Sequence, residues 1–153
     1  MSDEINNING KLKFEGEYFN GEKNGKGKEY NLSVISYVYF NKNKDSKYTN
    51  KKYEILQEHY LMFEGEYKYG KRNGNGKEYD NKGILKFEGE YINGKRNGNG
   101  KEYYNKNKLF YEGEYLNDKK NGKVKEYDYR GKCIFKGEYK NGEKIKKDAC
   151  LII

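Results

Sequence analysis

Short segments with an aromatic residue at each end and a glycine in the middle recur along the chain. Phe63–Tyr67, Phe87–Tyr91, Tyr111–Tyr115 and Phe135–Tyr139 have this form, with glutamate or lysine at the remaining positions, and each begins 24 residues after the one before it. Strand side chains alternate between two faces, so the aromatic residues and the glycine share one face and the charged residues share the other. Each segment is therefore predicted to be a strand with one apolar face.

A turn and a second strand complete the repeat. Asn and Gly tolerate the positive φ angles of tight hairpins, so residues 93–98 are predicted to form a turn and residues 99–104 a return strand. A further copy starts at Phe14, whereas the copy that starts at Phe135 has no recognisable return strand in residues 143–148. The predicted fold is all-β: an elongated, twisted, single-layer antiparallel β-meander of about five 24-residue hairpin repeats.

The repeats divide the chain into three parts. Residues 1–13 are expected to be a flexible N-terminus, residues 14–145 the repeat array, and residues 146–153 a basic flexible tail. Residues 31–62 interrupt the array and are predicted to form one lengthened hairpin. Apolar residues in this insertion either cap the array or form a ridge for a partner, and the ridge would consist of Val34, Tyr37, Val38 and Phe40.

The core is expected to be a row of aromatic rings on one face of the sheet. A strand glycine weakens pairing unless another group packs closely over it, so we expect a ring from the next hairpin to lie across each glycine. The predicted core residues are Phe14, Tyr18, Phe63, Tyr67, Phe87, Tyr91, Tyr111, Tyr115, Phe135 and Tyr139, and the predicted close-packing glycines are Gly16, Gly65, Gly89, Gly113 and Gly137.

Composition supports a thin sheet and excludes a thick apolar core. The chain has 37% charged residues, no Pro and no Trp, yet it has 18 Tyr. A tyrosine can bury its ring while its hydroxyl stays in water. The start of the sequence shows no apolar segment typical of a secretory signal, so a cytoplasmic location is expected.

Catalytic and metal-binding patterns are not found. His59 is the only histidine, and two cysteines do not make a zinc site, so Cys133 is expected to be a buried, inert thiol. The glycines of residues 74–77 precede a strand, whereas a phosphate loop must lead into a helix. The glutamates beside each glycine recur in every copy, which favours cross-strand pairing with lysine over catalysis. We expect no enzyme activity and no cofactor.

The net charge of +8 permits an anionic partner. Lysines are interleaved with glutamates throughout, which argues against nucleic acid. The predicted turns bring cations to one edge of the sheet as a basic stripe for a membrane or an acidic partner, with further lysines near the C-terminus; the residues are Lys23, Lys71, Arg72, Lys95, Arg96, Lys119, Lys120, Lys144, Lys146 and Lys147. Plain solvation of these residues is the alternative.

The last four residues form a CaaX-like box. Cys150 is followed by three aliphatic residues, and prenyl transferases attach an isoprenoid to a cysteine in this position. One lipid chain binds membranes only marginally, and the lysines before the box would supply the second, electrostatic signal. The alternative is an unmodified tail.

The repeated motif resembles the MORN repeat. The resemblance rests on Tyr/Phe-Glu-Gly-Glu-Tyr followed by Asn-Gly and Gly-x-Gly, and it covers residues 14–30 and 63–145. Two features depart from the family pattern: Tyr91 and its counterparts stand where Trp is frequent, and Val124 replaces a glycine. The resemblance implies an elongated β-sheet that serves as a scaffold, as an organiser at a membrane or as an accessory module on an enzyme.

These observations predict a non-enzymatic scaffold or adaptor, held at the cytoplasmic face of a membrane by a prenylated Cys150 and an anionic surface. The alternative is a soluble protein-binding module, of the enzyme-accessory or antitoxin-like kind, without a lipid anchor. The sequence does not identify a protein partner. An open edge strand near residues 135–139 would also allow a homodimer.

Overall fold

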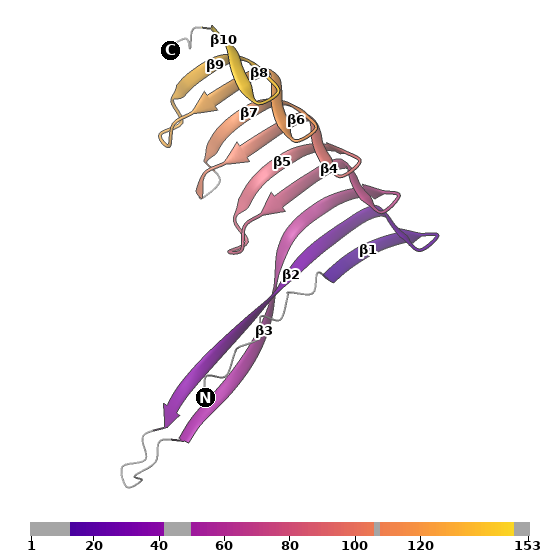
Figure 1. The fold of residues 1–153 in the computed structure, drawn as a ribbon, viewed down its shortest axis with the longest axis vertical. Helices are drawn as coiled ribbons and strands as arrows, with labels where there is room; N and C mark the ends of the chain where they lie inside the picture. Colours follow the sequence, from indigo (N-terminus) through magenta and orange to yellow (C-terminus); the bar gives the residue numbers. More distant parts are fainter. Residues whose placement is uncertain (1–12, 42–49, 106–107, 149–153) are drawn as a thin grey trace.

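The computed structural model describes residues 13–41, 50–105 and 108–148, and for residues 32–41 and 50–58 it describes the backbone only. Ten strands form one open antiparallel sheet in which each strand pairs with its neighbours in the chain (Figure 1). This arrangement confirms the predicted single-layer β-meander. The strands are β1 Lys13–Phe19, β2 Glu22–Asn41, β3 Asn50–Lys68, β4 Lys71–Tyr79, β5 Leu85–Ile92, β6 Lys95–Tyr103, β7 Leu109–Leu116, β8 Lys119–Tyr127, β9 Cys133–Lys140 and β10 Glu143–Asp148.

The insertion lies in the β2–β3 hairpin, which extends beyond the other hairpins as a two-stranded arm (Figure 1). Its pairing runs from Tyr30 opposite Leu61 to Asn41 opposite Asn50. The predicted ridge belongs to this arm, but the side chains of Val34, Tyr37, Val38 and Phe40 lie outside the described residues, so the ridge stays a prediction.

The turns that join β1–β2, β3–β4, β5–β6, β7–β8 and β9–β10 are shorter than the sequence indicates. In β5–β6 only Asn93 and Gly94 form the turn, with φ angles of 52° and 85°, and β6 already begins at Lys95. Two successive positive φ angles match the right-handed twist of a hairpin. The second Asn-Gly pair encodes a β-bulge instead, because Gly98 has a φ of 102° where the β5–β6 register shifts. The predicted turn at residues 93–98 is thus corrected.

The last hairpin also differs from expectation. Residues 143–148, expected to lack strand structure, form β10, and Lys147 pairs with Gly137. Residues 146–148 therefore belong to the sheet and not to a flexible tail.

A line of glycines crosses the sheet from strand to strand. Each glycine is the pairing partner of the next, and the line ends where Gly113 pairs with Val124; its members are Gly16, Gly27, Gly65, Gly76, Gly89, Gly100 and Gly113. A Cβ atom on Gly89 would lie 2.6 Å from the carbonyl oxygen of Asn99 and 2.8 Å from the ring of Phe87. The line thus exists because the paired strands and the rings leave no room for a side chain.

The origin of the covering rings corrects the expectation from sequence. Phe87 of the same strand lies over Gly89. A Cβ atom on the return-strand glycine Gly76 would lie closest to the ring of Phe63, in its own hairpin, and 3.2 Å from the ring of Tyr91, in the next hairpin. Gly65 is likewise next to the ring of Phe63 in its own strand.

Within the part of the chain that the structure describes, no helix is long and apolar enough to span a membrane.

Candidate binding surfaces

Aromatic residues form a buried row on one face of the sheet, here called the ring row. Phe87 and its counterpart Phe63 are almost fully buried, and rings of successive hairpins meet edge to face, as Phe63 and Tyr91 do at 5.3 Å between centroids. Such contacts contribute about 0.5–1.5 kcal/mol beyond burial. The buried members of the row are Phe63, Tyr67, Phe87, Tyr91, Tyr111, Tyr115, Phe135 and Tyr139.

The first copy of the repeat contributes less to the core than predicted. Phe14 is half-buried and packs against Tyr67, but Tyr18 is 59% exposed. In the later copies the second aromatic residue packs against the hairpin before it, as Tyr91 does against Phe63. No hairpin within the described residues precedes β1, so Tyr18 has no such ring to contact.

A layer of cations covers the ring row, which explains how a single-layer sheet buries its rings. The Cζ atom of Arg72 lies 4.0 Å from the centroid of Phe63, and Nζ of Lys120 lies 3.8 Å from the centroid of Tyr111. Each such contact contributes about 0.5–2 kcal/mol, more when the cation is partly desolvated. The cation layer consists of Lys23, Arg72, Arg96, Lys120 and Lys144.

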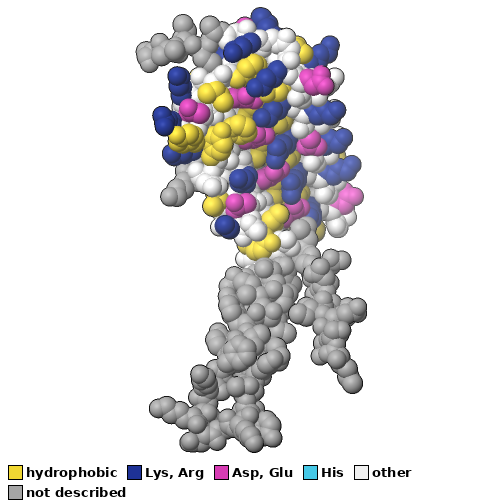
Figure 2. Space-filling model, turned by 60° about the vertical axis from the view of Figure 1, so that its left-hand side comes forward, with side chains coloured by type: hydrophobic (Ala, Val, Ile, Leu, Met, Phe, Trp, Pro, Cys, Tyr) yellow, Lys and Arg dark blue, Asp and Glu magenta, His cyan; other side chains and the backbone are white. Residues whose placement is uncertain are grey.

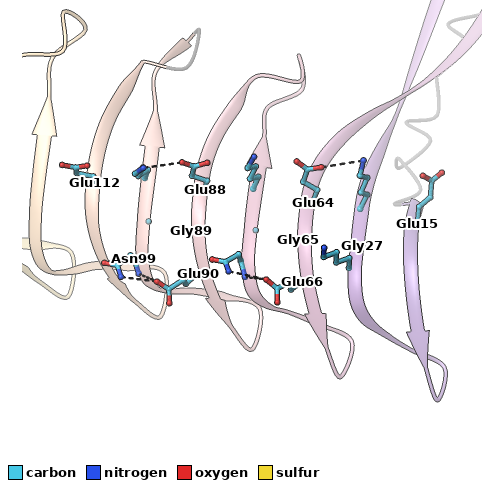
Figure 3. Close-up of a pocket in the computed structure, with 17 residues that line it drawn as sticks. Glu15, Gly27, Glu64, Gly65, Glu66, Glu88, Gly89, Glu90, Asn99 and Glu112 are labelled. Atoms are coloured by element: carbon cyan, nitrogen blue, oxygen red, sulfur yellow. Dashed lines mark hydrogen bonds and ion pairs between the residues drawn. The ribbon is translucent and has the colours of Figure 1, made fainter.

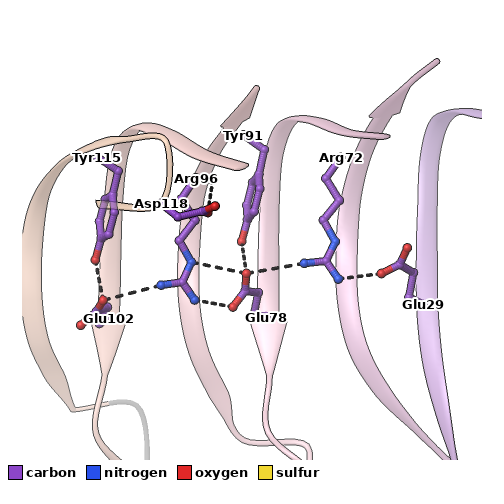
Figure 4. Close-up of polar contacts among 8 residues, drawn as sticks. All are labelled: Glu29, Arg72, Glu78, Tyr91, Arg96, Glu102, Tyr115 and Asp118. Carbon is purple, nitrogen blue, oxygen red and sulfur yellow. Dashed lines mark hydrogen bonds and ion pairs between the residues drawn. The ribbon is translucent and has the colours of Figure 1, made fainter. Parts of the chain in front are cut away.

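Glutamates link four of the five cations, from Lys23 to Lys120, into a continuous chain, and Figure 4 shows its middle part. Arg72 bridges Glu29 and Glu78, with nitrogen–oxygen distances of 2.6 and 3.6 Å, and Arg96 continues the chain from Glu78 to Glu102. Ring-row tyrosines join it, since the hydroxyl of Tyr91 donates to Glu78 at 2.6 Å. Arg72, Arg96, Lys120 and Lys144 therefore each bind a glutamate of the hairpin before their own, whereas Lys23 binds Glu29 of its own hairpin.

These contacts set the ionisation of the glutamates. Burial alone would raise the pKa of Glu78, but hydrogen bonds from Arg96 and Tyr91 and the charge of Arg72 outweigh it and hold the pKa below its ordinary value. The pKa of Glu29 is lowered in the same way against burial, by hydrogen bonds from Lys23 and Arg72. Both carboxylates are therefore ionised, and each pairs with two cations.

The glutamates of this chain escaped the sequence analysis. Glu78 lies two residues after Gly76, so strand alternation places both on the face of the rings, and Glu78 pairs directly with Phe87. The two-residue spacing between Gly76 and Glu78 is the sequence signal that could have placed these glutamates on the face of the rings.

The cation layer also corrects the predicted basic stripe. Arg72, Arg96 and Lys120 are engaged over rings, as are Lys23 and Lys144, so these five do not face outward as a stripe. Lys146 is paired with Glu138 and Asp148. The exposed cations of the predicted set with no ion pair among the described residues are Lys71, Lys95, Lys119 and Lys147.

The opposite face carries a groove of about 850 Å³ that runs across the strands. Figure 3 shows the arrangement: Gly27, Gly65 and Gly89 lie between two rows of polar side chains. One wall contains Glu64 and Glu88 and the other contains Glu66, Glu90 and Asn99, with the glycine backbone between them. The groove therefore has a floor without side chains and two charged walls.

The glutamates of the two walls have different partners. Glu88 pairs with Lys101 at 3.8 Å, which is the cross-strand pairing that the sequence suggests, and its Oε1 also accepts from Tyr103. Glu90 instead accepts a hydrogen bond from the backbone N–H of Asn99 at 3.0 Å, at the bulge. One wall thus alternates in charge, while the carboxylates of the other hold the bend of the strands.

Charge is mixed over the surface. Figure 2 shows Lys and Arg interleaved with Asp and Glu across the visible face, with apolar side chains between them. That side presents no extended patch of one sign of the kind that nucleic-acid binding uses.

Few residues offer other chemistry. His59 is exposed. Cys133 is half-buried at the start of β9 and disulfide-bonded, which corrects the expectation of a buried thiol. Among the described residues, no three His, Cys, Asp or Glu side chains are grouped to hold a metal ion. Cys150 lies outside the described residues, so its predicted lipidation stays a prediction.

Comparison with known proteins agrees with this architecture. The family model of the MORN repeat matches residues 14–31, 63–84, 87–108 and 111–123. No curated protein matches the chain. The matched segments contain the strand, turn and glycine pattern described above, and the family is generally non-catalytic. The chain is therefore a MORN-repeat protein, and its repeats form a binding or scaffold module.

Proposed function

We propose that the protein is a non-enzymatic scaffold held at the cytoplasmic face of a membrane by a prenylated Cys150. The observation that carries the proposal is the CaaX-like box, which begins at Cys150, two residues after the end of β10. A single isoprenoid binds membranes only marginally, so a second contact is needed. The exposed lysines that remain outside the cation layer supply positive charge for an anionic leaflet, at about 1 kcal/mol for each lysine near the surface.

We assign this second contact to lysines whose charge the sheet does not already use. Lys144 is held by Glu126 at 2.8 Å and lies over Phe135, so the sheet already uses its charge. Lys147 is exposed. Most of the electrostatic contribution is therefore assigned to Lys71, Lys95 and Lys119 at the turns.

The intact mass of the protein purified from eukaryotic cells tests the anchor. Loss of three residues with gain of a C15 or C20 isoprenoid and a methyl group is the expected result. Because Cys133 is disulfide-bonded, the mass is measured with and without reductant. In the same cells, Cys150→Ser should move the protein from the membrane fraction to the soluble fraction, and an unmodified wild-type mass would exclude the anchor.

The groove favours a second candidate, a soluble protein-binding module without a lipid anchor. Its length across several hairpins, its bare floor and its paired walls suit an extended protein segment. Proximity labelling distinguishes this candidate: a partner lost from Lys77→Glu/Lys101→Glu but kept by Lys82→Glu/Lys132→Glu would support it. A partner set unaffected by either pair would exclude the groove.

A further inference from the structure

The first strand of the sheet, β1, pairs on one side only among the described strands. Its sequence from Phe14 to Tyr18 is identical to residues 63–67 of β3 and 87–91 of β5, which both pair on two sides. Tyr18 is 59% exposed, whereas its counterpart Tyr91 is 2% exposed. Within the described part of the chain, β1 therefore presents the side chains of an inner strand without the preceding strand that covers them in the later repeats.

The open side of β1 already has the geometry of an inner strand. The rings of Phe14 and Tyr18 meet edge to face with 5.3 Å between their centroids, as Phe87 and Tyr91 do at 5.8 Å. The bulge that follows Gly16 in the β1–β2 pairing has its counterpart in the β5–β6 pairing. An added strand would thus meet a preformed surface, which lowers the entropy lost on binding.

The inner junctions show which residues a strand needs in order to cover such an edge. Where β4 covers β5, Gly76 lies opposite Gly89, and a Cβ atom on Gly76 would lie 3.2 Å from the ring of Tyr91. Two residues later, Glu78 lies opposite Phe87 and accepts a hydrogen bond from the hydroxyl of Tyr91 at 2.6 Å. The covering strand therefore has a small residue beside the tyrosine ring and a carboxylate at its hydroxyl.

The other inner junctions repeat this pattern. Glycine is the small residue in β2 and β6 and valine in β8, and a glutamate follows two positions later; the pairs are Gly27 and Glu29, Gly100 and Glu102, and Val124 and Glu126. The residue between them is a lysine in all four covering strands. A strand that covers β1 should thus contain Gly-Lys-Glu, with glycine opposite Gly16, lysine opposite Glu15 and glutamate opposite Phe14.

Glu15 shows where the lysine of an added strand would lie. On the groove face, Glu15 ends the wall that contains Glu64 and Glu88 (Figure 3). Glu64 pairs with Lys28 of the strand before it at 3.8 Å. The ion pair of Glu15 is instead with Lys13 of its own strand, at 2.6 Å, and both side chains are half exposed. An added strand would therefore bring its lysine to a carboxylate that is still accessible.

The described strands of a second copy do not fit this edge. Strands β2, β4 and β6, which contain Gly-Lys-Glu, pair on both sides. The predicted open edge at residues 135–139 is covered by β10, and β10 has Lys147 opposite Gly137 where the other return strands have a small residue. Two β1 strands paired through their glycines would set Glu15 of one copy opposite Glu17 of the other, and like charges directly opposite are destabilising.

We propose that β1 binds an extended segment of another protein that contains Gly-Lys-Glu and adds to the sheet as a further antiparallel strand. Backbone hydrogen bonds of the added strand provide affinity, and the positions beside Tyr18 provide specificity. Residues 3–5 stand as far before Phe14 as Gly-Lys-Glu stands before Phe87, but they are Asp-Glu-Ile, so the chain does not supply the motif there itself. This inference goes beyond the proposed membrane scaffold and depends on neither the lipid anchor nor the groove.

A labelled peptide tests the proposal. Its sequence is Lys-Arg-Asn-Gly-Asn-Gly-Lys-Glu-Tyr, which is the sequence of both β4 and β6. Fluorescence anisotropy with the unprenylated full-length protein should show saturable binding, and a scrambled peptide of the same composition, which has the same charge, should not bind. A peptide with lysine in place of the second glycine should bind about tenfold more weakly or worse, because its side chain would meet the ring of Tyr18.

Protein variants locate the site. Tyr18→Asp should weaken peptide binding by about tenfold or more, while Tyr69→Asp, which alters another largely exposed tyrosine, should not. Hydrogen exchange should show new amide protection in β1 when the peptide is bound, and urea unfolding confirms that each variant is folded. Absence of peptide binding, equal affinity for the lysine-substituted peptide, equal losses in the two variants, or new protection at β10 in place of β1 would each overturn the proposal. None of these outcomes bears on the mass of the protein from eukaryotic cells.

Discussion

The Cζ atom of Arg96 lies 4.0 Å from the centroid of the Phe87 ring, in the same hairpin, while the guanidinium of Arg96 binds Glu78 in the hairpin before it. One side chain therefore shields the core from water and joins two repeats. Cationic side chains usually point into solvent, but Arg96 covers the buried ring of Phe87.

Loss of this cation should destabilise the sheet. Arg96→Ala exposes the ring of Phe87 and leaves Glu78 with one fewer partner, so we expect a loss of about 2 kcal/mol in the free energy of unfolding. Lys95→Ala is the matched control, because Lys95 is the exposed neighbour, and it should change stability by less than about 0.5 kcal/mol. Urea unfolding followed by tyrosine fluorescence measures both. Similar losses in the two variants would contradict the role of the cation layer.

The glycine line should tolerate no side chain. In Gly89→Ala the new Cβ would meet the backbone of Asn99 and Gly100 at 2.6 and 2.7 Å, and backbone cannot move aside easily. We expect a loss of about 3 kcal/mol or failure to fold. Gly83→Ala has open space but a φ of 73°, so it should cost only about 1 kcal/mol. A larger loss at Gly83 than at Gly89 would show that φ, not packing, explains the line.

Acid should weaken the protein within a defined range of pH. The pKa values of Glu29, Glu78 and Glu126 are lowered on folding, because hydrogen bonds from cations and tyrosines outweigh burial. A lowered pKa contributes stability that is present above the ordinary value of 4.5 and is lost as pH falls through the lower folded value. Urea midpoints at several pH values should therefore be level above about pH 5 and fall below about pH 4. In Glu78→Gln the fall should be smaller, and an equal fall would assign it to other groups.

Tyr69 should be replaceable with a gain in stability, because bulky residues are rare at its φ angle of 52°. Tyr69→Asn places at this turn the residue type that Asn93 provides in the next repeat, and it should raise the free energy of unfolding by about 0.5–1 kcal/mol. The reverse change, Asn93→Tyr, should lower it by a similar amount. Thermal unfolding of the two variants provides the comparison. If Tyr69→Asn is less stable than the wild type, the ring of Tyr69 has a structural role.

The sequence predicts the sheet well because its signals are periodic. The spacing of Phe63 and Phe87, and the alternation around Gly89, determine the strands and the face of the rings. The cation layer was missed because Arg96 stands beside Asn and Gly residues that suggest a longer turn, and only the short turn at Asn93 and Gly94 places Arg96 on a strand. The exposure of Tyr18 depends on its position at the start of the array and not on its own repeat.

The position at which each strand begins also decides which lysines point away from the rings. Lys95 and Arg96 are adjacent and alike in charge, but strand alternation directs one to each face. Sequence composition cannot distinguish them until the first residue of the strand is known. The groove was missed for a related reason: its floor is backbone, which no residue type marks.

The chain of Glu29, Arg72, Glu78, Arg96 and Glu102 has a consequence for how the array unfolds. The arginine of each hairpin pairs with a glutamate of the hairpin before it. When one hairpin unfolds, the arginine of the next hairpin therefore loses that ion pair. In a linear array whose units contact only their neighbours, such coupling raises the cost of every boundary between folded and unfolded repeats. The described hairpins should consequently exchange amide hydrogens with solvent as one cooperative block, with loss of protection starting at the ends of the sheet.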